Sequence, residues 1–142
     1  MHAQRGYTAI ELSVALSLAG ILVAGSVFSI RSSLAREALD GWARSMTLDI
    51  AAGQQAAVTL RATVNITVTT TSYTMAVSGG NTFRNATLPA DISLTTTCSS
   101  NVCAFDRRGV PLAAGTITLT SALAKRSYVV TINPTTGSVS YQ

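Results

Sequence analysis

The stretch from Arg5 to Ile30 reads RGYTAIELSVALSLAGILVAGSVFSI, and it decides how the rest of the chain is interpreted. Its residues 7–30 include a single charged residue, Glu11. At about 1.5 Å of rise per residue, a helix of this length spans roughly 36 Å, which is enough to cross a hydrocarbon core of about 30 Å. The stretch therefore predicts a membrane-spanning helix over residues 7–30.

Glu11 is the anomaly in this apolar stretch. A charged side chain inside a membrane costs on the order of 3 kcal/mol even on lenient scales. An ionisable residue in such a position indicates a functional site, and it needs a partner of opposite charge.

The residues Gly6-Tyr7-Thr8-Ala9-Ile10-Glu11, followed by Leu-Ala-Gly-Ile-Leu at 18–22, resemble the N-terminus of type IV pilins and type II secretion pseudopilins. In that family a short basic leader ends in Gly and is followed by Phe-Thr-Leu-Ile-Glu and an apolar helix. Here Tyr7 replaces the usual Phe and Ala9 replaces Leu. Both replacements keep the character of the site.

The resemblance implies that residues 1–6 form a prepilin leader, that prepilin peptidase cleaves after Gly6, and that Tyr7 is then N-methylated. It also implies that Glu11 pairs with the N-terminal ammonium of Tyr7 on a neighbouring subunit. At about 4 Å and an effective dielectric constant near 20, this attraction is worth roughly 4 kcal/mol, which is comparable to the cost of burying the acid. The implied partners are other pilin or pseudopilin subunits, the peptidase and an inner-membrane assembly platform.

Residues 1–30 could instead form a secretory signal peptide or a generic membrane anchor, and both alternatives stay open. Glu11 and the length of the apolar run disfavour a signal peptide. Counting Lys and Arg on either side of the span would place the C-terminal side in the cytoplasm. The resemblance instead implies an inner-membrane protein with a periplasmic C-terminal domain, and we adopt that orientation because two cysteines suit an oxidising compartment.

The composition excludes several kinds of catalytic site. The only histidine, His2, lies in the predicted leader, so the mature chain would contain none. Without histidine, neither Ser-His-Asp nor Cys-His catalysis is available, and two cysteines alone cannot complete a zinc site. We therefore predict neither an enzyme nor a cofactor. Because the net charge of +4 is mild, it permits an acidic partner without requiring one.

Cys98 and Cys103 are the only cysteines of the chain. In an exported domain this spacing favours a disulfide that closes a small loop, worth roughly 2 kcal/mol by loop entropy. Two buried free thiols are the alternative.

Residues 31–60 predict an amphipathic continuation of the same helix. Apolar and small residues recur every three or four positions and form one stripe: Leu39, Trp42, Met46, Ile50, Gly53, Ala57 and Leu60. Since no proline occurs before Pro89, we expect one helix from about Thr8 to Leu60, with a possible kink at Asp40-Gly41. Gly53 is expected to let a sheet approach closely.

After Leu60 the apolar period changes from 3.6 to 2, which is typical of strands with one buried face. The alternating pairs and triplets are Val64/Ile66/Val68, Tyr73/Met75/Val77, Ile92/Leu94, Ile117/Leu119, Val130/Ile132 and Val139/Tyr141. Turns are predicted at 78–81, at 108–111 and at 133–137. The predicted fold is therefore α+β: a long N-terminal helix whose second half packs on a small antiparallel β domain, residues 61–142, of six to eight strands.

The C-terminal part resembles the GspH/FimT-type minor pseudopilins and minor pilins. The resemblance is carried by AFDRRGVP at 104–111, by GTITL at 115–119 and by a last hairpin that ends in Gly137-Ser138-Val139. It implies a structural or priming subunit of a type IV pilus or of a type II secretion pseudopilus.

DNA binding by a pilus that takes up nucleic acid is the alternative function. Two basic pairs could contact phosphates, Arg107-Arg108 and Lys125-Arg126, with Arg84 as a further candidate. The simpler interpretation is that both pairs are solvated surface turns.

Overall fold

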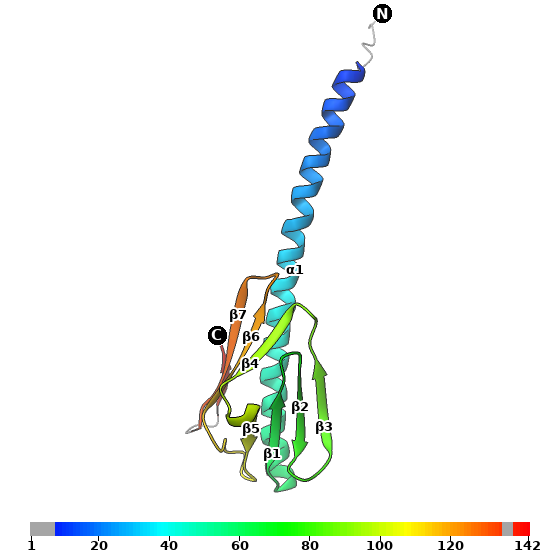
Figure 1. The fold of residues 1–142 in the computed structure, drawn as a ribbon. Helices are drawn as coiled ribbons and strands as arrows, with labels where there is room; N and C mark the ends of the chain where they lie inside the picture. The colour runs from blue at the N-terminus through cyan, green and yellow to red at the C-terminus, as the bar shows by residue number, and fades with distance from the viewer. Residues whose placement is uncertain (1–7, 135–137) are drawn as a thin grey trace, which may run out of the picture.

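A single long helix dominates the structure, a computed structural model that describes residues 8–134 and 138–142, without the side chains of residues 24–29 and of Tyr141. Helix α1 (Ala9–Leu60) has 52 residues and is therefore roughly 78 Å long. Figure 1 shows its first half projecting alone, with the β domain gathered around its second half. The predicted single helix is confirmed, and it runs through Asp40-Gly41 without interruption.

The two ends of α1 are capped by different means. At the start, the hydroxyl of Thr8 accepts a hydrogen bond from the backbone N–H of Glu11. At the end, Arg61 adopts a left-handed conformation with φ 50°, and its N–H donates to the carbonyl groups of Ala57 and Val58. Both caps satisfy backbone groups that a helix terminus leaves without partners.

One face of the second half of α1 is buried by the β domain. Its buried positions are Ala35, Leu39, Ala43, Met46, Ile50, Gly53 and Ala57. The predicted stripe is confirmed except at its end. Trp42 is partly buried and packs against the core, whereas Leu60, the last helical residue, is 56% exposed.

In the part of the chain that the structure describes, the β domain consists of eight antiparallel strands in two four-stranded sheets. The first sheet has the order β3-β2-β1-β5 and the second the order β4-β6-β7-β8. The strands are β1 (Val64–Val68), β2 (Ser72–Val77), β3 (Thr82–Thr87), β4 (Ile92–Thr96), β5 (Val102–Phe105), β6 (Gly115–Ser121), β7 (Arg126–Ile132) and β8 (Val139–Tyr141). The antiparallel arrangement was predicted, whereas the division into two sheets was not.

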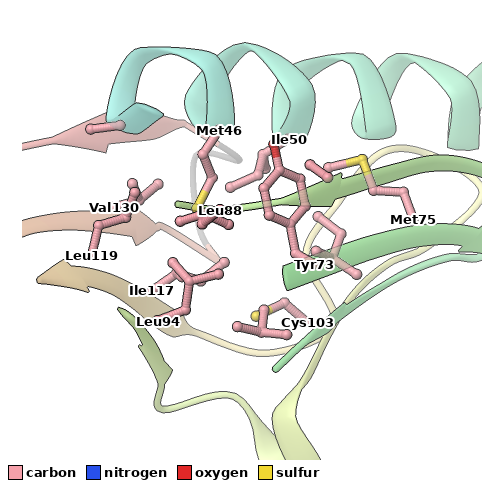
Figure 2. Close-up of a cluster of buried hydrophobic side chains, with 14 of the residues drawn as sticks. Met46, Ile50, Tyr73, Met75, Leu88, Leu94, Cys103, Ile117, Leu119 and Val130 are labelled. Atoms are coloured by element: carbon pink, nitrogen blue, oxygen red, sulfur yellow. The ribbon is translucent and has the colours of Figure 1, made fainter. Parts of the chain in front are cut away.

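The two sheets and the helix share one core. Figure 2 shows Met46 and Ile50 of α1 facing Tyr73 and Met75 of the first sheet and Ile117, Leu119 and Val130 of the second. Among the described strands, the chain crosses between the two sheets three times: from β3 to β4, from β4 to β5 at residues 97–101, and from β5 to β6.

Gly53 lies on the buried face of α1, as expected, but the sheet does not require a glycine there. A Cβ atom built on Gly53 would lie 3.5 Å from the sulfur of Met75 and 3.8 Å from a methyl group of Val64. These are ordinary van der Waals distances, so the expectation of an unusually close approach is wrong.

The described part of the first half of α1 is exposed all round. Its large apolar side chains are each more than half exposed: Ile10, Leu12, Val14, Leu16, Leu18, Ile21, Leu22 and Val23. Within the described residues, no helix combines the length and the hydropathy needed to cross a membrane. These side chains have no cover within the chain itself.

Candidate functional site

Glu11 and Thr8 form a reciprocal capping pair at the start of α1. The backbone N–H and the hydroxyl of Thr8 donate to the Glu11 carboxylate at 3.1 Å and 3.2 Å, while the N–H of Glu11 donates to the Thr8 hydroxyl at 3.3 Å. An acid in the first turn also interacts favourably with the helix dipole. Glu11 therefore has an ordinary structural role in the free chain, beside any role in assembly.

This capping pair was missed by the sequence reasoning, although the pattern Thr-x-x-Glu ahead of an apolar run is its known signature. The predicted cleavage and methylation positions, Gly6 and Tyr7, lie outside the described residues. The surroundings of Glu11 fit the expectation of an acid within an apolar surface, because Ile10 is 76% exposed and Leu12 is 60% exposed.

A tight turn after β5 places the first predicted basic pair at the end of α1. One carboxylate oxygen of Asp106 accepts hydrogen bonds from the N–H groups of Arg108 (2.8 Å) and Val110 (2.9 Å), and the second oxygen accepts from the Arg108 guanidinium at 3.2 Å. The hydrogen bond from the Val110 backbone, with those from Arg108, holds the pKa of Asp106 below its ordinary value. Asp106 thus fixes the turn in its charged form.

Gly109 allows this turn to lie against the helix. It has φ +77°, and a Cβ atom there would lie 3.0 Å from a methyl group of Val58 and 3.3 Å from the carbonyl oxygen of Gln54. A side chain would meet both the steric cost of a left-handed conformation and this contact. The turn and the last turns of α1 are therefore packed directly on one another.

A cleft of about 530 Å³ opens at this junction. It is lined by Arg61, Thr63, Asp106, Arg107 and Arg108. A second hollow beside it is lined by Val58 and the same three arginines. We call this region the arginine cleft and define it by Arg61, Arg107 and Arg108. Arg61 was missed by the sequence reasoning because it lies 46 positions before Arg107, and only the packing of the turn on α1 brings the two together.

The remaining basic candidates lie elsewhere. Lys125 ends the turn between β6 and β7, and Arg126 begins β7, whereas the turn with Arg107 and Arg108 precedes β6. Figure 1 shows these two turns at opposite ends of the β domain. Arg84 on β3 is bound at 2.9 Å to Asp49 of α1. The four candidate residues for DNA therefore do not form one surface.

The cysteines form a disulfide at the connection between β4 and β5, where the chain passes from one sheet to the other. Cys98 and Cys103 have their Cα atoms 5.3 Å apart and connect the end of β4 to β5. Gly115, at the start of β6, faces this bond so closely that an added Cβ atom would lie 2.3 Å from the Cys98 sulfur. Within the described residues, no three His, Cys, Asp or Glu side chains lie close enough together to hold a metal ion.

A long helix with an exposed apolar first half, packed by its second half on an antiparallel β domain, defines the type IV pilin fold. Two crystal structures of the type IV minor pilin FimU from Pseudomonas aeruginosa are similar to this chain. The form in space group P21 has a TM-score of 0.61 and 13% identity, and the match covers 75% of this chain and 90% of FimU. The P65 form has a TM-score of 0.60 and 12% identity and covers 73% and 92%.

The family model described as type II transport protein GspH matches residues 43–136. The chain belongs to this family, and the predicted resemblance to GspH-type minor pilins is confirmed. A search of curated proteins finds no match.

Proposed function

We propose that this protein is a minor pilin or pseudopilin, a structural or priming subunit of a type IV pilus or a type II secretion pseudopilus. The observation that carries the proposal is the combination of GspH family membership with a helix that exposes its large apolar side chains all round between Ile10 and Val23. Such a surface needs either lipid or equivalent helices as cover.

In this proposal residues 7–30 first anchor the chain in the inner membrane, with the β domain in the periplasm. Prepilin peptidase removes residues 1–6, Tyr7 is N-methylated, and an inner-membrane assembly platform transfers the subunit into the filament. The Glu11 carboxylate then exchanges part of its bonding to Thr8 for the ammonium group of a neighbouring Tyr7. The mechanism is assembly, and the protein itself breaks no bond.

Intact-mass and N-terminal analysis of the membrane-extracted protein tests the processing. We expect a chain that begins with N-methylated Tyr7. A mature chain that begins at any other residue would contradict the proposal.

The role of Glu11 in assembly can be separated from its role in capping. Glu11→Gln keeps a side-chain acceptor for Thr8 but removes the charge, whereas Thr8→Val removes the cap but keeps the charge. We expect Glu11→Gln to reduce incorporation into filaments at least tenfold, and Thr8→Val and Glu37→Ala, an exposed acid of the second half, to reduce it less than threefold. If Thr8→Val were as damaging as Glu11→Gln, the acid would act through the cap alone.

DNA binding by an uptake pilus is the second candidate function, and the arginine cleft is the observation that favours it. Arginine guanidinium groups bind phosphate oxygens well, and such binding weakens steeply with salt. Purified protein should then retard duplex DNA in a salt-dependent way, and Arg107→Gln/Arg108→Gln should abolish the shift.

A further inference from the structure

We propose that the arginine cleft is the docking site for an acidic segment of the neighbouring pilin or pseudopilin subunit, a contact separate from the pairing of Glu11. This inference rests on the proposed function, because it requires a filament in which subunits meet. It names a second interaction surface and the chemistry of its partner, a protein segment with one or two carboxylates.

The cleft carries positive charge that the described residues do not neutralise. Asp106 is the one acid among the lining residues, and it is already engaged by two backbone N–H groups and by the Arg108 guanidinium. The ion pairs of the described residues include neither Arg61 nor Arg107, and both side chains are exposed. The site therefore has two arginines in excess, and arginine binds carboxylates through paired hydrogen bonds.

The backbone that presents these arginines is fixed before any partner arrives. Arg61 is held in a left-handed conformation by its hydrogen bonds to the end of α1. Arg107 and Arg108 belong to the turn that Asp106 closes through its hydrogen bonds. Gly109 lets this turn pack against Val58 and Gln54 of α1. Because the fold sets the backbone positions of these arginines, binding of a partner costs less free energy for ordering the site than it would on a flexible loop.

The surroundings favour an acidic protein segment over nucleic acid. The hollow beside the cleft has an apolar wall in Val58, which is 50% exposed, and neither hollow has an aromatic side chain among the described residues that line it. Binding along a nucleic acid uses a track of cations, and binding of single strands also uses aromatic stacking platforms. Here the second exposed basic pair, Lys125 and Arg126, lies at the far end of the β domain, so the two groups of basic residues do not form one continuous track.

The position of the cleft indicates which neighbour it meets. It lies where α1 ends, at the opposite end of the molecule from the exposed first half of the helix (Figure 1). When such helices pack side by side in one direction, this end of the β domain can contact only the subunit ahead of it. An acidic and apolar patch on the rear of that subunit would complete the contact.

The chain offers a closely matched control for the test. Arg61 and Lys125 are both exposed residues with left-handed conformations, at φ 50° each, and Arg107 and Arg126 are both exposed arginines in or beside turns. The cleft variant is Arg61→Asn/Arg107→Gln, and the control is Lys125→Asn/Arg126→Gln. Asparagine tolerates the left-handed conformation, and both variants remove two positive charges.

The full mature chain in nonionic detergent is titrated with a fluorescent hexaglutamate peptide, a hexaglutamine peptide, a 20-base-pair DNA duplex and inorganic phosphate. We expect hexaglutamate to bind, hexaglutamine not to bind, and the cleft variant to bind hexaglutamate at least tenfold more weakly while the control stays within twofold of the parent. Equal losses in both variants, or tighter binding of the duplex or of phosphate through the cleft, would overturn the assignment to an acidic protein segment.

Filament incorporation in cells completes the test, with Glu11→Gln as a reference. We expect the cleft variant to lower incorporation at least fivefold and the control to leave it unchanged. If the cleft variant assembles normally while Glu11→Gln does not, the docking inference fails and the proposed function stands. If both assemble normally, both fail. Arg107→Gln alone is measured beside them. Because Arg107 is exposed, this single variant should fold normally, so that a loss of incorporation in it cannot be the result of misfolding.

Discussion

The phenol hydroxyl of Tyr73 on β2 donates a hydrogen bond to the carboxylate of Asp49 on α1, and so joins the first sheet to the helix by a polar contact at the edge of the core. Arg84 of the edge strand β3 binds the same carboxylate through its Nε and a terminal nitrogen, each at 2.9 Å. One acid of the helix therefore holds two neighbouring strands. This connection adds to the antiparallel pairing with β2 that holds β3, a strand that buries only Ala86.

Tyr73→Phe removes the hydroxyl and leaves Asp49 with Arg84 alone. We expect the free energy of unfolding to fall by about 1–3 kcal/mol, the usual loss for a hydrogen bond to a charged group. Chemical denaturation of the detergent-solubilised chain measures it.

The same contact predicts how the domain responds to alkali. Burial raises the pKa of Tyr73, and the hydrogen bond to Asp49 and its negative charge raise it further. Since the folded state favours the neutral phenol, its contribution to stability is complete below the ordinary tyrosine pKa of about 10 and is lost as the pH rises through the higher folded value. An ultraviolet titration should show one tyrosine that ionises well above the ordinary tyrosine pKa, and Tyr73→Phe should remove that late step.

Two glycines of α1 are predicted to be replaceable by alanine with a gain in stability. Gly41 is exposed with open space around a Cβ atom, and at Gly53 that atom would make ordinary contacts with Met75 and Val64. Each substitution should raise the free energy of unfolding by up to about 1 kcal/mol, because glycine is a poor helix former. A loss of stability in Gly53→Ala would mean that the helix and the first sheet lie closer together than these contacts imply.

The turn that carries Arg107 and Arg108 should become less stable at acid pH, because Asp106 holds it in place. Its pKa is lowered by the hydrogen bonds that it accepts, so its contribution is present above the ordinary aspartate pKa of about 4 and is lost as the pH falls through the lower folded value. Hydrogen exchange at the amides of Arg108 and Val110 should accelerate in that acid range. Asp106→Asn keeps an oxygen acceptor for these amides and should remove the pH dependence, whereas Asp106→Ala should accelerate exchange at every pH.

Gly115 and the disulfide should be energetically coupled. Removing the bond by Cys98→Ser/Cys103→Ser should cost about 2 kcal/mol on the loop-entropy account. Gly115→Ala places a Cβ atom against the Cys98 sulfur, so it should destabilise the oxidised chain and do so less strongly when both cysteines are serine. A double-mutant cycle on thermal or denaturant unfolding measures this difference. Purely additive costs would argue against the contact.

Much of the fold could be predicted because its signals are local. The helix from about Thr8 to Leu60 follows from apolar spacing without an interrupting proline, and the six alternating segments from Val64 to Tyr141 all lie in strands. Strand β3 was missed because five of its six residues are exposed, and an exposed edge strand has no apolar alternation. Strand β5 was missed because it has only four residues, among them a cysteine already interpreted as half of a loop.

What could not be predicted depends on distant parts of the chain meeting. Nothing near Arg61 in the sequence indicates that it will lie beside Arg107, and nothing near Asp49 indicates that Tyr73 and Arg84 will bind it. The division into two sheets likewise follows from the pairing of β4 with β6 and of β5 with β1, which local alternation does not encode. The Thr8–Glu11 cap, by contrast, was readable in the sequence.

The exposed apolar side chains in the first half of α1 limit how the subunit can move from one apolar environment to another. Eight large aliphatic side chains between Ile10 and Val23 are uncovered within the chain, and each costs roughly 2 kcal/mol in water. A free-energy cost of this size keeps the concentration of free subunits in water close to zero. In the proposed function, the subunit would therefore have to pass from the bilayer into the growing fibre without leaving apolar surroundings, so the supply of subunits would depend on how many copies wait in the membrane at the base and not on diffusion through the aqueous space.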